Sequence, residues 1–245
     1  MSIDNTFIAV LIASGLACLV TTIGIYVINH YSEWGKRNVA HFMSFAAGVL
    51  ITVSLMHILP EAYEMNSKAP SFVLIGFMGL YVSNRILDRY RFHRKDHTDL
   101  SFGLIPMIGI GLHSFIDGVI YSVTFNVSIF MGALAAIGMV LHEFPEGIVT
   151  YLLLDRGGMS KKKAIWWSWI AAAFSTPLGA MVSYPFIHVI DQSILGLLLA
   201  LSAGALLYVG ATHLLPAVEA EEKEFTLVSL FLGIAVAVII VLVER

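Results

Sequence analysis

The stretch LHSFIDGV at residues 112–119 decides the fold of this chain, because it recurs as LHEFPEGI at residues 141–148. The two stretches align without a gap, 29 residues apart, and share Leu, His, Phe, an acid, Gly and an aliphatic residue in the same order. Residues four apart lie on one face of a helix. One face of each predicted helix therefore carries a histidine and an acid: His113 with Asp117, and His142 with Glu146.

The composition predicts that these helices lie in a membrane. Of the 245 residues, 58% are hydrophobic and 13% are charged, and the mean hydropathy is +0.84. Soluble domains carry about 25% charged residues, and about 20 mainly apolar residues in a helix cross a bilayer. Eight segments are long enough, approximately residues 6–29, 39–62, 71–90, 103–125, 128–154, 163–187, 194–218 and 225–243. We therefore expect an all-α membrane protein with eight transmembrane helices, in which residues 1–245 form a single transporter domain.

The distribution of positive charge predicts the orientation. If the N-terminus lies outside the cytoplasm, 12 of the 14 Lys and Arg residues fall in cytoplasmic loops, and only Lys68 and Arg245 fall outside. Lys and Arg are enriched in cytoplasmic loops of membrane proteins. We therefore expect both termini to be extracytoplasmic, in the cytoplasmic (inner) membrane of a bacterium or archaeon.

A second repeat joins two other segments. Residues 45–62, FAAGVLITVSLMHILPEA, match residues 201–218, LSAGALLYVGATHLLPAV, at an offset of 156. The alignment pairs identical residues: Gly48 with Gly204, His57 with His213, and Pro60 with Pro216. In the expected topology the two members of each repeat run antiparallel. Inverted repeats of this kind are typical of secondary transporters, whose binding site lies near the membrane midplane.

The two histidines and two acids of the first repeat are candidate metal ligands. A charged side chain at the bilayer centre costs about 2.5–3.5 kcal/mol and usually faces the bundle interior. Two imidazoles and two carboxylates suit tetrahedral zinc, and they also accept cadmium, iron or manganese. The lone Cys18 excludes a thiolate cluster. A His–acid network satisfied by the protein alone remains an alternative, and we expect no prosthetic group.

Further polar residues near the helix ends suggest a path for the ion. They form an entrance and an exit: His57 with Glu61 toward the outside, and His213 with Glu219 toward the cytoplasm. Prolines interrupt the hydrogen-bond ladder beside both histidines. Histidines that cap interfacial helix ends are the alternative. The basic loop with His93 and His97 is assigned to lipid contact or to fixing the topology.

The sequence resembles the ZIP (Zrt/Irt-like) family of metal transporters over essentially the whole chain. The motifs that carry the resemblance are HSFIDG at residues 113–118 and HEFPEG at residues 142–147. The resemblance implies a bundle of three, two and three helices with both termini outside, a binuclear metal centre between the fourth and fifth helices, and a homodimer. That topology agrees with the one obtained from the loop charges.

Residue by residue, the resemblance gives His113, Asp117, His142 and Glu146 the positions of the family's first metal site. The second site is weakened. Ser114 stands where the family has Asn, and Thr176 stands where the sixth helix often has Glu, while Glu143 keeps its acidic position. We therefore expect one strong site with a weak or absent second site, to which Glu143 would contribute, and we count Ser114 with the transport path.

These features predict transport of a divalent transition-metal cation, with zinc as the first choice, into the cytoplasm by alternating access. The sequence has no phosphate-binding loop for ATP, so transport is expected to be passive or coupled to an ion. An intramembrane zinc hydrolase is an alternative, because HEFPE differs from the HExxH signature only in its last residue; we expect a non-enzyme. A metal-sensing receptor is a further alternative. The expected partners are the lipid bilayer and the metal ion, with no nucleic acid.

Overall fold

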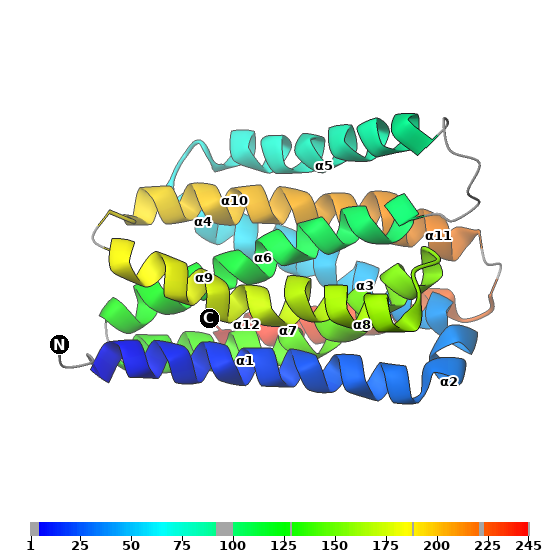
Figure 1. Ribbon diagram of the computed structural model, residues 1–245. Coiled ribbons are helices and arrows are strands. Elements are labelled where there is room, and N and C mark those ends of the chain that lie inside the picture. Colours follow the sequence, from blue (N-terminus) through cyan, green and yellow to red (C-terminus); the bar gives the residue numbers. More distant parts are fainter. Residues whose placement is uncertain (1–4, 92–99, 128, 188, 221–222, 245) are drawn as a thin grey trace.

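The computed structural model describes residues 5–91, 100–127, 129–187, 189–220 and 223–244. Every secondary-structure element within these ranges is a helix, and the helices form an elongated bundle (Figure 1). The expected all-α class is therefore confirmed. His93 and His97 lie outside the described residues.

The helical elements follow one another in this order: α1 (Asn5–His30), α2 (Ser32–Arg37), α3 (Val39–Val53), η1 (Ser54–Ile58), α4 (Leu59–Met65), α5 (Ala69–Arg91), α6 (Leu100–Val127), α7 (Ile129–Arg156), α8 (Lys161–Ser168), η2 (Trp169–Phe174), α9 (Ser175–Ser183), η3 (Tyr184–Phe186), α10 (Gln192–Tyr208), η4 (Val209–Leu214), α11 (Leu215–Glu219) and α12 (Thr226–Glu244). Several of these elements join end to end into single long rods, as η1 does with α3 and α4.

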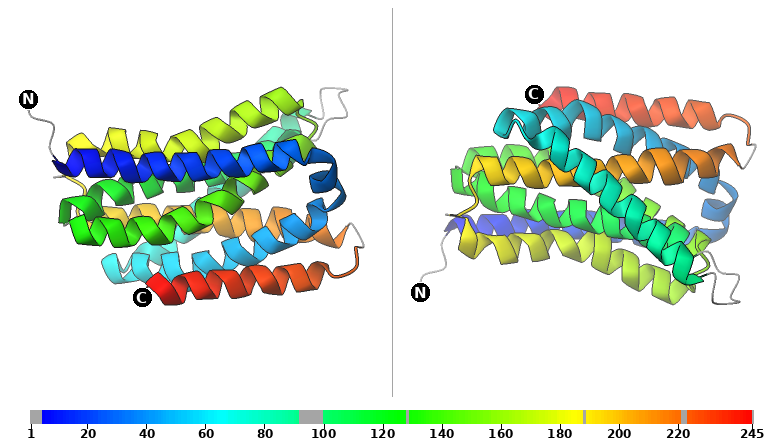
Figure 2. Two further views of the ribbon diagram at one scale, coloured as in Figure 1. Left: turned by 90° about the horizontal axis from the view of Figure 1, so that it is seen from below. Right: turned by 90° about the horizontal axis from the view of Figure 1, so that it is seen from above.

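Six of the rods formed by described residues are long and apolar enough to cross a membrane: Asn5–His30, Val39–Met65, Phe102–Val127, Ala135–Arg156, Lys161–Phe186 and Gln192–Glu219. The other two predicted segments correspond to α5 and α12. Within α12, Thr226–Ile239 forms a shorter apolar helix. α1 begins and α12 ends at the same end of the bundle, which we call the terminal end; the opposite end is the far end (Figures 1 and 2).

Glycines bring four of the helices into backbone contact. A Cβ atom at Gly48 of α3 would lie 2.4 Å from the carbonyl oxygen of Leu230 in α12, and one at Gly233 of α12 would lie 2.1 Å from that of Phe45. α5 and α10 contact each other in the same reciprocal way. A Cβ at Gly76 of α5 would lie 2.1 Å from the carbonyl oxygen of Leu201, and one at Gly204 of α10 would lie 2.0 Å from that of Val73. α10 in turn packs on α4, and η4 on α3. We call these helices the α3–α10 group.

The remaining long helices form a second group, in which glycines again bring helix backbones into contact. A Cβ at Gly24 of α1 would lie 2.4 Å from the carbonyl oxygen of Phe144 in α7, and one at Gly147 of α7 would lie 2.4 Å from that of Thr21. In α6 and α9, a Cβ at Gly118 would lie 2.0 Å from the carbonyl oxygen of Thr176, and one at Gly179 would lie 2.0 Å from that of Phe115. We call α1, α6, α7 and α9 the α6–α7 group.

The prolines of the second repeat widen two helices at equivalent points. Proline has no N–H to donate to the carbonyl four residues earlier. Just before Pro60 and Pro216 the chain forms π-helical turns, η1 and η4, which hold His57 and His213. Leu59 donates its N–H to Ser54, and Leu215 donates to Gly210, so both bonds span five residues. These residues are 156 apart, as in the sequence repeat.

The packing predicts opposite outcomes for two glycines of α5. A Cβ at Gly76 would meet the Leu201 carbonyl oxygen at 2.1 Å, whereas a Cβ at Gly79 would meet nothing within 4 Å. Gly76→Ala should destabilise the fold by roughly 1–3 kcal/mol through overpacking, and Gly79→Ala should not. Thermal unfolding of both purified variants in one detergent measures the difference. Equal melting temperatures would contradict the close approach of α5 and α10.

Candidate metal centre

The two stretches of the first repeat meet in the middle of the bundle. His113 Nε2 of α6 lies 3.6 Å from Asp117 Oδ2 and 3.5 Å from Glu146 Oε1 of α7. His142 Nε2 donates a hydrogen bond of 2.9 Å to Asp117 Oδ2. Ligand atoms of His113, His142 and Glu146 all lie within 4.8 Å of one another. The structure thus brings together the four residues that the repeat singled out.

These separations fit a shared cation. Ligands about 2.1 Å from a tetrahedral zinc lie about 3.4 Å from one another, close to the separations of His113 Nε2 from the two carboxylates. Glu146 is buried, and its Oε1 has no hydrogen-bond partner among the described residues. A buried carboxylate oxygen without a donor is costly. An ion between Glu146 and His113 would satisfy it.

Two serines hold the ligands in place. His113 Nδ1 lies 2.9 Å from the hydroxyl of Ser202 in α10. A neutral histidine that gives its Nδ1 proton to this hydroxyl presents the Nε2 lone pair to a metal, as metal-bound histidines commonly do. Ser114 donates to Glu146 Oε2 at 3.2 Å. The structure therefore places Ser114 beside a ligand, as part of the centre itself.

Glu143 faces a different set of partners. Its side chain is fully buried and accepts hydrogen bonds from Thr21 of α1 and from Thr176 of α9, the latter at 3.2 Å. One of its oxygens also lies within 4.8 Å of ligand atoms of Asp117 and His142. The two threonine hydroxyls bond to different oxygens of Glu143, while Asp117 and His142 are also ligands of the first site, so a weak second site at Glu143 stays a prediction.

A cavity of about 220 Å³, lined by both polar and aliphatic side chains, leads from the centre toward the terminal end. His113, Asp117 and His142 line its floor, and His57 and Glu61 line it farther out. His57 Nε2 lies 3.7 Å from Glu61 Oε2, and both side chains are partly exposed. The structure thus joins the predicted entrance residues to the metal centre through one cavity.

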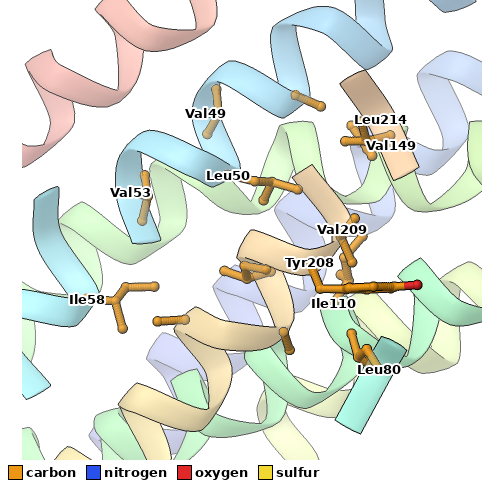
Figure 3. Close-up of a cluster of buried hydrophobic side chains, with 14 of the residues drawn as sticks. Val49, Leu50, Val53, Ile58, Leu80, Ile110, Val149, Tyr208, Val209 and Leu214 are labelled. Atoms are coloured by element: carbon orange, nitrogen blue, oxygen red, sulfur yellow. The ribbon is translucent and has the colours of Figure 1, made fainter. Parts of the chain in front are cut away.

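On the far side of the centre the passage is narrow and apolar. A cavity of only about 30 Å³ adjoins His113, His142 and Glu146, and aliphatic side chains such as Val53, Leu50 and Leu206 enclose it. Several of these residues belong to a buried hydrophobic cluster, in which Figure 3 shows Val49, Leu50, Val53, Ile110 and Val149. Among the described residues that line this cavity, His113, His142 and Glu146 alone have polar side chains.

The predicted exit residues are not joined to the centre by a described cavity. His213 is buried in η4, and its ring packs against those of Tyr208 and Phe102, with centroids 5.0 and 6.4 Å away. Glu219 is exposed at the end of α11. A path through His213 and Glu219 would require the aliphatic cluster to open.

The sequence pattern did not single out Ser202 or Thr21. Both are small polar residues within apolar helices, where such side chains most often bond to their own backbone. One available signal was the position of Ser202 in the second repeat, where Ala46 is its counterpart in the otherwise similar partner.

The comparisons with known proteins agree with the geometry. The sequence model of the ZIP zinc transporter family matches residues 5–102 and 93–241. The zinc transporter ZupT of Shigella flexneri serotype 5b is 31% identical over 80% of this chain and 84% of its own length. ZupT of Chlorobium luteolum is 29% identical over 95% of this chain and 96% of its own length.

The family that matches is one of transporters, so the hydrolase alternative is set aside and the chain is not an enzyme. The match extends over nearly all of the described helices and includes both stretches of the first repeat. This chain belongs to the ZIP zinc transporter family.

Proposed function

We propose that this protein carries zinc into the cytoplasm through the centre between α6 and α7, as a multi-pass protein of the bacterial cytoplasmic membrane. The observation that carries the proposal is the buried Glu146 Oε1, which has no hydrogen-bond partner among the described residues and lies 3.5 Å from His113 Nε2. A transported ion completes this site, and the cavity that His57 and Glu61 line connects the site to the terminal end of the bundle. The relatives named as zinc transporters support zinc as the cargo.

Nitrogen and oxygen ligands in this number favour zinc, but they do not exclude neighbouring metals. Cadmium, iron(II) and manganese(II) accept the same imidazole and carboxylate donors. Selectivity among these ions then depends on how closely α6 and α7 hold the four side chains. Competition among the four ions in a reconstituted flux assay ranks them.

The proposed topology has eight membrane crossings, arranged three, two and three, with both termini outside. α5 and α12 supply the two crossings beyond the six long apolar rods. The matching π-helical turns at Ser54–Ile58 and Val209–Leu214 support an inverted repeat. The glycine contacts support it too, because the α6–α9 pair mirrors the α7–α1 pair, and the α3–α12 pair mirrors the α10–α5 pair. In this topology, the cavity that His57 and Glu61 line opens to the outside.

Transport in this proposal is a movement of the α6–α7 group against the α3–α10 group. Within each group, glycines bring backbones into contact, whereas three cavities lie between the groups. One of these, about 640 Å³ in volume, separates α7 from α3 and α12 and is lined by apolar side chains such as Phe45, Phe144 and Leu232. Rigid groups whose boundary contains cavities suit alternating access.

The ion in this proposal is bound by one site per chain. Glu143 is held by two threonine hydroxyls and would at most assist the ligands of the first site. The homodimer implied by the resemblance stays a prediction, because the exposed apolar side chains of α5 and α12, such as Leu74 and Phe231, suit lipid as well as a second copy.

The ligand assignment predicts loss of transport in two variants. His113→Ala and Glu146→Ala each remove a metal ligand, so zinc uptake into proteoliposomes should fall to the level of empty vesicles, and zinc binding by calorimetry should be lost. Ser14→Ala is the matched control, because the Ser14 hydroxyl bonds only to its own helix at Val10 and Leu11. Unaltered uptake in both ligand variants would defeat the assignment. Saturable binding by the wild type without flux would indicate a receptor.

The hydrogen bonds of Glu143 predict a binding stoichiometry. Purified protein should bind one zinc per chain, and Glu143→Gln should keep that stoichiometry, because glutamine can still bond to Thr21 and Thr176. His142→Ala serves as the comparison, since it removes a ligand of the first site. Metal analysis of equilibrated samples gives the ratio. Two ions in the wild type and one in Glu143→Gln would show that Glu143 holds a second ion.

A further inference from the structure

The hydroxyl of Ser202 joins the α3–α10 group to a proposed metal ligand of the other group. Ser202 is fully buried in α10, and its hydroxyl lies 2.9 Å from His113 Nδ1. Other buried serines bond within their own helix, as Ser14 does to Val10, or within their own group, as Ser44 does to Thr226 and Ser122 to Ala180. The bond of Ser202 instead crosses the boundary along which the proposed movement takes place.

We propose that Ser202 is a positioning residue that strengthens metal binding in the outward-facing state alone; the proposal rests on the alternating-access function proposed above. While the bond exists, it fixes the orientation of the His113 ring and keeps the proton on Nδ1, so that Nε2 faces Asp117 and Glu146. A movement of one group against the other by even a few ångströms breaks a hydrogen bond. The ring then loses this support.

The repeat indicates what replaces the bond in the opposite state. In a transporter built from inverted repeats, exchanging the conformations of the two halves generates the opposite-facing state. His113 corresponds to His142 at offset 29, and Ser202 corresponds to Ala46 at offset 156. In the opposite-facing state, the equivalent contact therefore joins His142 to Ala46. The methyl group of Ala46 cannot form a hydrogen bond with the imidazole. Ala46 and His142 already line the same small cavity.

The two states consequently hold the ion with different strength. Partners that orient a metal-bound histidine contribute about 10- to 100-fold to metal affinity, and a neutral hydroxyl belongs at the lower end of that range. An outward-facing site with Ser202 in place captures zinc more tightly than an inward-facing site in which the histidine meets Ala46. The serine thus favours loading outside and release inside without any further ligand.

The test measures zinc affinity by calorimetry and zinc uptake by proteoliposomes for reciprocal variants. Ser202→Ala should weaken binding and raise the KM of uptake, each about tenfold, while Vmax stays close to that of the wild type. Ser202→Thr, which keeps the hydroxyl, should restore the wild-type KM. Ala46→Ser should tighten binding and lower Vmax, because the inward-facing site now holds the ion. Ser14→Ala controls for loss of a buried hydroxyl.

Two results would overturn the proposal. The first is an affinity and KM for Ser202→Ala that equal those of Ser14→Ala. The second is a lower Vmax for Ala46→Ser with unchanged affinity, which is the effect of altered packing. If Ser202→Ala fails to give a single folded species on gel filtration, Ser202→Cys replaces it, since a thiol of similar size is a weaker hydrogen-bonding group. Wild-type protein that neither binds nor transports zinc refutes the underlying function instead.

Discussion

The rest of the structure depends on the need to compensate two imidazoles and two carboxylates buried in the middle of an apolar bundle. His113, Asp117 and Glu146 are buried and His142 is partly buried, and an uncompensated charge at the bilayer centre costs about 2.5–3.5 kcal/mol. Within the chain, Asp117 is satisfied by His142, and one oxygen of Glu146 by Ser114. The other oxygen of Glu146 has no hydrogen-bond partner among the described residues, and in the proposed function a cation binds it.

The packing around this centre separates rigidity from freedom of movement. Where helices of one group cross, glycine lets the backbone of one helix rest on a carbonyl of the next, and such crossings leave no room for sliding. Between the groups, most contacts are made by aliphatic side chains beside the cavities, with a ring contact of Phe102 to His213 and a hydrogen bond from Arg156 to Met43. Aliphatic contacts are non-directional, so they can be exchanged for similar contacts at modest cost, whereas the bond between Ser202 and His113 is directional and is lost outright.

The composition predicts the all-α membrane class, and spacing along one helix predicts that His113 lies beside Asp117 and His57 beside Glu61; that these residues bind the ion stays a prediction. His113 and Asp117 had to share a face, and a histidine four residues before Glu61 had to lie beside it. Contacts between helices are harder to predict. Thr21 is 122 residues from Glu143 and Ser202 is 89 residues from His113, and no periodicity relates them. The exit through His213 and Glu219 stays a prediction, since the structure packs His213 among aromatic rings.

The widened turns before Pro60 and Pro216 carry information about the origin of the chain. A π-helical turn amounts to one extra residue accommodated in an α-helix. The extra residue stands at the same repeat position in both halves, between Ser54 and Leu59 and between Gly210 and Leu215. Two independent insertions at matching sites are a less economical history than one. A single duplicated segment that already held the histidine, the widened turn and the proline would account for both copies with one event.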